Sequence, residues 1–142
     1  MDSSHHALEG EDPGSFNTDP PSSGPHDETP LDAGLYDETA AMRAGPYPAG
    51  HLVHNLEHGY VILWYNCKLI DIAACVELKG QIQEVIVDAH NTKVIAFPWI
   101  LIDVPVVMTS WGRMLPFENF NTTLARRFVT ANHNKAPEPQ AP

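Results

Sequence analysis

Three histidines have the residue type and spacing needed to bind a metal ion. His54 and His58 stand four residues apart in the segment HLVHNLEHG, and two imidazoles at that spacing on one helical face can share an ion. His26 ends the proline-rich segment DPPSSGPH. Because this segment is stiff, the His26 side chain would lose little conformational entropy on binding a metal ion. We predict that His26, His54 and His58 bind a copper or zinc ion, because imidazole suits both.

Two neighbouring residues can support this site. Glu57 precedes His58 and lies three residues after His54, so it could bind the ion, hold an imidazole in one tautomer, or act as a base. His51 lies three residues before His54 and can join the same helical face. We therefore place Glu57 and His51 in the predicted site as supporting residues.

Two other functions remain open for the same residues. The string HNLEH matches the inverted zincin motif, in which two histidines bind zinc and the glutamate activates water. Gly59 and an apolar run follow it directly, whereas zincin motifs lie inside a longer helix, and this disfavours a peptidase. One alternative is a metal-dependent hydrolase with Glu57 as base. The other is a metal-free interaction module with structural histidines, and the sequence favours metal binding over both.

Hydrophobic periodicity predicts the elements that must position these residues. Helices are expected over 52–58, where Gly59 ends the helix, over 72–87, and from the capping residue Asn121 to about 131. Apolar runs predict strands over 60–65, over 93–97, which Pro98 stops, and over 104–110. This order indicates an α+β fold: a small central β-sheet, two to three helices and an irregular Pro/Gly-rich N-terminal arm.

Charge and composition divide the chain into one domain and two tails. Ten acidic residues lie between Asp2 and Glu38 with no basic residue among them, and they carry the whole net charge of −10. Pro-Pro and Gly-Pro steps before Gly50 exclude regular helix there. We predict a flexible acidic tail over 1–18, a single globular domain over 19–131 and a disordered tail over 132–142. The charge repels nucleic acid and attracts cations, so a metal ion is the expected partner.

The two cysteines allow three arrangements. Cys67 and Cys75 flank a predicted loop after the first strand. In an oxidising compartment they could form a disulfide that contributes about 2–3 kcal/mol to stability. They could equally be buried free thiols, or soft ligands for copper.

Three segments together resemble a known bacterial family. DPPSSGPH (19–26), LVHNLEHGYVILWYNC (52–67) and TSWGR (109–113) are similar to motifs of the domain-of-unknown-function family DUF3105, with Ser22 where threonine is usual and Ser110 where alanine is usual. The resemblance singles out Ser23, Gly24, His26, His54, Glu57, His58, Gly59, Trp111 and Gly112. It implies a shared site and supplies no reaction. Trp111, which Gly112 follows, could cover the metal pocket or fill the core, and we place Ser23 and Trp111 among the supporting residues.

The same resemblance implies an extracytoplasmic or membrane-anchored protein. The N-terminus MDSSHHALEGED has neither the basic nor the apolar region of a signal peptide. No apolar run reaches the length of about twenty residues that spans a membrane. We therefore expect either a cytoplasmic protein or a chain that begins after a removed leader.

Overall fold

The computed structural model of the protein describes residues 6–7, 20–23, 26–27 and 29–142. Side chains are described for 20–23 and 29–142. The predicted acidic tail over 1–18 therefore lies outside the described residues, apart from the backbone of 6–7.

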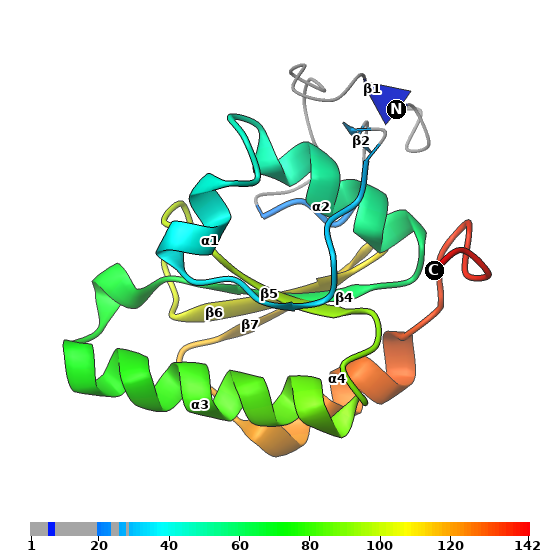
Figure 1. Ribbon diagram of the computed structural model, residues 1–142. Coiled ribbons are helices and arrows are strands. Elements are labelled where there is room, and N and C mark those ends of the chain that lie inside the picture. Colours follow the sequence, from blue (N-terminus) through cyan, green and yellow to red (C-terminus); the bar gives the residue numbers. More distant parts are fainter. Residues whose placement is uncertain (1–5, 8–19, 24–25, 28) are drawn as a thin grey trace.

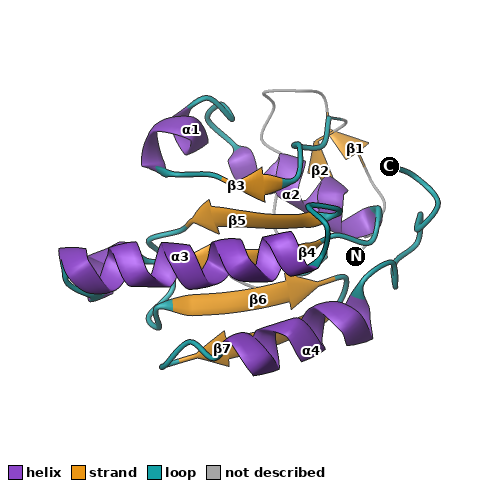
Figure 2. Cartoon of the chain, turned by 60° about the horizontal axis from the view of Figure 1, so that its bottom comes forward, coloured by secondary structure: helices purple, strands orange, loops and turns teal. Residues whose placement is uncertain are grey.

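Five strands form one mixed sheet (Figure 2). In spatial order they are β3 (Gly34–Leu35), β5 (Val94–Pro98), β4 (Val61–Tyr65), β6 (Val106–Ser110) and β7 (Arg113–Phe117). The strands β3, β5 and β4 run parallel, whereas β6 runs antiparallel to both β4 and β7. Two short strands, β1 (His6–Ala7) and β2 (His26–Asp27), pair separately in parallel.

Helices cover both faces of the sheet (Figure 1). On one face lie α1 (Glu38–Met42) and α2 (Pro48–Glu57), and on the other lie α3 (Ile72–Asp88) and α4 (Thr122–Asn132). A short 3₁₀ helix, η1 (Cys67–Leu69), links β4 to α3. The predicted α+β fold with a central sheet is confirmed, and no helix among the described residues is long and apolar enough to cross a membrane.

Alternate side chains of the central strands point to opposite faces of the sheet, and these strands are buried on both faces because helices cover both. The side chains packed against α3 and α4 are Val61, Leu63, Tyr65, Val94, Ala96, Val106 and Met108. Those packed against Leu52, Val53 and Leu56 of α2 are Ile62, Trp64, Ile95, Phe97 and Val107. The helix that carries the candidate metal ligands is therefore fixed to the sheet by a continuous apolar layer.

The structure corrects two details of the sequence analysis. The helix expected over 52–58 begins four residues earlier, at Pro48, because proline is tolerated in the first turn of a helix, where no hydrogen bond to its nitrogen is needed. The exclusion of helix before Gly50 was therefore wrong, as α1 shows as well. The prediction also missed β7, whose side chains are mostly exposed and whose sequence contains Pro116.

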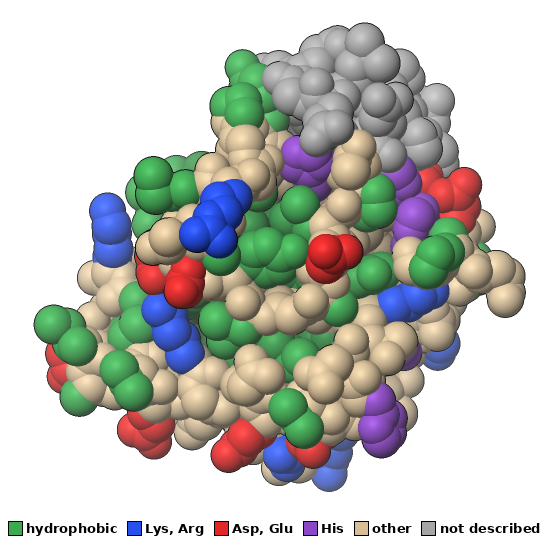
Figure 3. All heavy atoms as spheres, in the orientation of Figure 1, with side chains coloured by type: hydrophobic (Ala, Val, Ile, Leu, Met, Phe, Trp, Pro, Cys, Tyr) green, Lys and Arg blue, Asp and Glu red, His purple; other side chains and the backbone are tan. Residues whose placement is uncertain are grey.

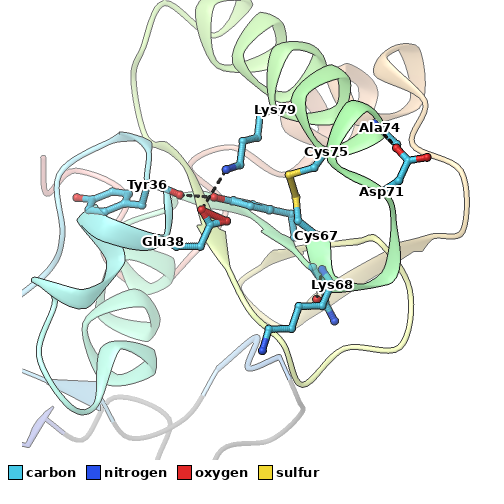
Figure 4. Close-up of a disulfide and its surroundings, with 10 residues drawn as sticks. Tyr36, Glu38, Cys67, Lys68, Asp71, Ala74, Cys75 and Lys79 are labelled. Carbon is cyan, nitrogen blue, oxygen red and sulfur yellow. Dashed lines mark hydrogen bonds and ion pairs between the residues drawn. A yellow bond between two sulfur atoms is a disulfide. The ribbon is translucent and has the colours of Figure 1, made fainter.

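A disulfide joins Cys67 to Cys75 and closes the connection between β4 and α3 (Figure 4). The two Cα atoms lie 5.4 Å apart, inside the range that a disulfide requires. One turn further along α3, Lys79 reaches Glu38 of α1 at 3.1 Å (Figure 4). Of the three arrangements open to the cysteines, the structure has the disulfide, so neither sulfur is a free thiolate for a metal.

Candidate metal centre

Four side chains form a group that could hold a metal ion: His54, Glu57, His58 and Glu138. Each offers one ligand atom, and these atoms all lie within 4.8 Å of one another. His54, Glu57 and His58 are buried, with 6%, 2% and 9% of their surface exposed, while Glu138 is exposed. Figure 3 shows histidine side chains gathered beside acidic ones at the edge of the molecule near the C-terminus.

The last turn of α2 brings the two histidines together. Their ring centroids lie 4.6 Å apart with the planes at 82°, as the spacing of four residues in a helix predicts. His58 caps this helix end, where the unpaired carbonyl groups carry partial negative charge and favour a cation. The helix end and the two carboxylates therefore all favour positive charge in the same place.

Both ring nitrogens of His58 face oxygen atoms. Nδ1 lies 3.1 Å from the backbone oxygen of Pro142, and Nε2 lies 3.4 Å from a carboxylate oxygen of Glu138. In the tautomer with the proton on Nδ1, the Nδ1–H group donates a hydrogen bond to the Pro142 oxygen, and Nε2 presents a lone pair to the Glu138 carboxylate. Two lone pairs repel unless a proton or a metal ion lies between them, and a second-shell bond at Nδ1 is usual for histidines that bind metals.

Glu138 belongs to residues 134–142, which we call the C-terminal strap. The backbone N–H of Asn134 donates to the Gly59 carbonyl, and that of Glu138 donates to the Glu57 carbonyl, both at 2.9 Å. The sequence analysis expected a disordered tail from residue 132 and did not include Glu138 in the site. The sequence of the strap does not indicate that it docks on α2, because backbone hydrogen bonds hold it there. Such bonds require no particular side chain, so they leave no pattern in the sequence.

Lys93 ties the strap to the end of α2. Its ammonium group donates to the His58 carbonyl at 2.9 Å, to Asn134 Oδ1 at 2.8 Å and to the Pro139 carbonyl at 2.9 Å. Partial burial lowers the pKa of Lys93 below its usual value. Lys93 was not singled out in the sequence, where an isolated lysine in a predicted strand carries no signal.

Gly59 allows the strap to approach α2 closely. Its φ of +91° lies in the left-handed region, and a Cβ placed there would lie 2.5 Å from the Cα of Asn134. We predict that Gly59→Ala lowers the free energy of unfolding by about 2 kcal/mol, from backbone strain together with the clash. Urea denaturation measures this change.

Gly80→Ala is the matched control for Gly59→Ala. Gly80 lies in α3, and nothing stands within 4 Å of the position of its Cβ. Alanine there should raise stability by about 0.5–1 kcal/mol, because it restricts the unfolded chain and favours helix. Equal effects of the two substitutions would contradict the close approach at Gly59.

Asn55 and His51 contact the N-terminal arm, the irregular segment before α1 that includes Thr29 and Leu31. The Asn55 side chain accepts from the Leu31 N–H at 2.8 Å and donates to the Leu31 carbonyl at 2.6 Å. His51 Nδ1 lies 2.5 Å from the Thr29 carbonyl. His51 is therefore a contact to the arm and not one of the four grouped side chains. Asn55 was missed in the sequence, although a polar residue among inward-facing positions of a helix could have indicated it.

The structure places the remaining predicted residues around the arm. The short strand β2, which contains His26, lies against α2, but the His26 side chain lies outside the described ones, so its role as a ligand stays a prediction. The Gly112 N–H donates to the Ser22 carbonyl at 2.8 Å, which brings the arm to the turn between β6 and β7. Ser23 is half-buried, and Trp111 packs against the core on the α2 side.

Comparison with known proteins agrees with the resemblance noted in the sequence. No curated protein and no solved structure matches the chain. Residues 9–142 match a family described as protein of unknown function (DUF3105). Because this match spans nearly the whole chain, the protein belongs to the DUF3105 family.

Proposed function

We propose that this protein binds a divalent transition-metal ion, zinc or cupric copper, through His54, Glu57, His58 and Glu138. The observation that carries the proposal is the convergence of four ligand atoms within 4.8 Å of one another, three of them from buried side chains. To reach zinc–nitrogen and zinc–oxygen bonds of about 2.0–2.2 Å, each atom would move inward by less than one bond length.

The donor set supports zinc or cupric ion over cuprous ion. Two imidazoles and two carboxylates suit zinc, and imidazoles also suit cupric ion. Cuprous ion prefers thiolates and thioethers, and both cysteines of this chain are joined in the disulfide. Cuprous ion therefore lacks a thiolate ligand here, and zinc and cupric ion are the two candidates that the ligands support.

The same donor set favours binding or delivery of the ion over hydrolysis. A catalytic zinc site keeps one coordination position open for water, whereas four protein ligands fill a tetrahedral site. A hydrolase would need Glu57 free to act as a base, but Glu57 is 2% exposed and belongs to the ligand group. With Glu57 and Glu138 both bound to the ion, neither carboxylate is left to activate water.

We also propose that the protein works outside the cytoplasm. The Cys67–Cys75 disulfide supports this location, because disulfides persist in oxidising compartments and are rare in the reducing cytosol.

The test of metal binding is elemental analysis and zinc titration of untagged protein prepared without chelator. We expect one zinc ion per chain, and a rise in the free energy of unfolding of about 2.7 kcal/mol when free zinc is a hundred times the dissociation constant. His54→Ala should abolish both effects. Each protein is compared with its own metal-free form, so that any loss of stability in the variant itself is subtracted.

His90→Asn is the matched control for His54→Ala. His90 is exposed and has a φ of +58°, a conformation that asparagine tolerates, and it lies outside the ligand group. The control should bind zinc as the parent does. If the parent takes up neither zinc nor copper, and chelator leaves its stability unchanged, the metal proposal fails and the interaction module with structural histidines replaces it.

A further inference from the structure

The candidate site is built from two parts of the chain that differ in how firmly they are held. His54, Glu57 and His58 come from α2, whose apolar residues pack against the sheet. Glu138 comes from the C-terminal strap, in which none of residues 134–142 is buried. Segments with few buried apolar contacts open at low free-energy cost, so the strap is the part of this site able to leave.

Several polar contacts hold the strap in the described structure. They are the Asn134 and Glu138 N–H bonds to α2 and its following glycine, the Lys93 bridge, and the contacts of His58 with Pro142 and Glu138. Each such bond replaces one with water, so its net contribution is modest. The half-exposed Glu138 side chain is the only strap side chain in the ligand group.

We propose that docking of the C-terminal strap is coupled to occupation of the metal site, so that the ion closes the strap and loss of the ion releases it. This inference rests on the proposed function. An ion that meets four ligands in the docked state meets three when the strap is away, and a ligand shifts an equilibrium by its difference in affinity for the two states.

The coupling would give the protein a way to exchange its ion. With the strap released, Glu138 leaves one coordination position open at the edge of the molecule. A ligand from a partner or from solution can then enter that position before the buried histidines let go. The strap therefore controls whether the bound ion is closed off by four protein ligands or accessible for transfer.

The amide proton of Glu138 reports strap docking directly, because it donates to the Glu57 carbonyl. We expect saturating zinc to slow hydrogen exchange at this amide by about tenfold or more, within the range of about 5- to 150-fold that is usual for coupled sites. Glu138→Gln should weaken zinc affinity by at least about tenfold, and zinc should no longer slow exchange at residue 138. Glu118→Gln, an exposed glutamate elsewhere, is the control and should change neither quantity.

Asn134→Gly tests the coupling without changing a ligand or the net charge. Asn134 has a φ of +63°, which glycine adopts freely, and the substitution removes its bond to Lys93. Because zinc binds the docked form more tightly, zinc affinity measured by titration should fall when the substitution lowers the docked fraction of the metal-free strap.

Two results would be decisive against these ideas, and they differ. If zinc binds but exchange at Glu138 is the same with and without it, the strap inference is wrong and metal binding stands. If isothermal titration shows no zinc binding by the parent protein, the proposed function fails and the strap inference fails with it.

Discussion

Asn55→Ala is expected to lower the free energy of unfolding by about 3 kcal/mol, because two partly buried hydrogen bonds are lost and the polar groups of Leu31 lose their partner. The Asn55 side chain is completely buried, and it is the donor and the acceptor for the Leu31 backbone. Urea denaturation measures the loss, and hydrogen exchange at the Leu31 amide locates it. Asn119→Ala, at an exposed asparagine, should change stability by less than about 0.5 kcal/mol.

The same variant tests the place of His26. The two hydrogen bonds from the Asn55 side chain to the Leu31 backbone hold the arm, which leads back to β2 and His26. If His26 is a ligand, releasing the arm should weaken zinc affinity in the folded variant. If the four grouped side chains suffice, affinity should stay at the parent value. If the Leu31 amide in Asn55→Ala remains protected from hydrogen exchange, the Asn55 side chain does not hold the arm.

Much of the fold could be predicted because its signals are local. The strand pattern at 60–65, the helix over 72–87 and the capping residue Asn121 lie within a residue or two of the observed elements. In each of these, hydrophobic periodicity or a cap acts over a few neighbouring residues. The early start of α2 was missed because the Pro-Pro and Gly-Pro steps predict no helix before Gly50, whereas Pro48 occupies the first turn of α2, where proline is tolerated.

The incomplete parts of the predicted site depend on long-range contacts. The spacing of His54 and His58 is a property of one helix, so their pairing could be read from the sequence. Glu138 lies eighty residues further along and reaches the site through backbone bonds to Glu57 and Gly59. Nothing in a proline-rich polar segment distinguishes a docked strap from a disordered tail.

Leu56→Ala is expected to lower the free energy of unfolding by about 4 kcal/mol, since a fully buried leucine leaves a cavity when it is truncated. Leu56 has no exposed surface and packs in the apolar layer between α2 and the sheet. Alanine is a better helix former than leucine, so the loss comes from packing alone. Leu124→Ala on α4, where the leucine is 45% exposed, is the matched control, with an expected change below about 1 kcal/mol.

The variant also separates the scaffold of the metal site from its ligands. Leu56→Ala keeps all four proposed ligands but loosens the packing that fixes the last turn of α2. Because a preorganised site loses less entropy when it binds, zinc affinity should fall in the folded variant, measured well below its unfolding midpoint. Unchanged affinity together with the full loss of stability would mean that the ligands gather around the ion by themselves, and that packing of α2 on the sheet contributes to the fold and not to the site.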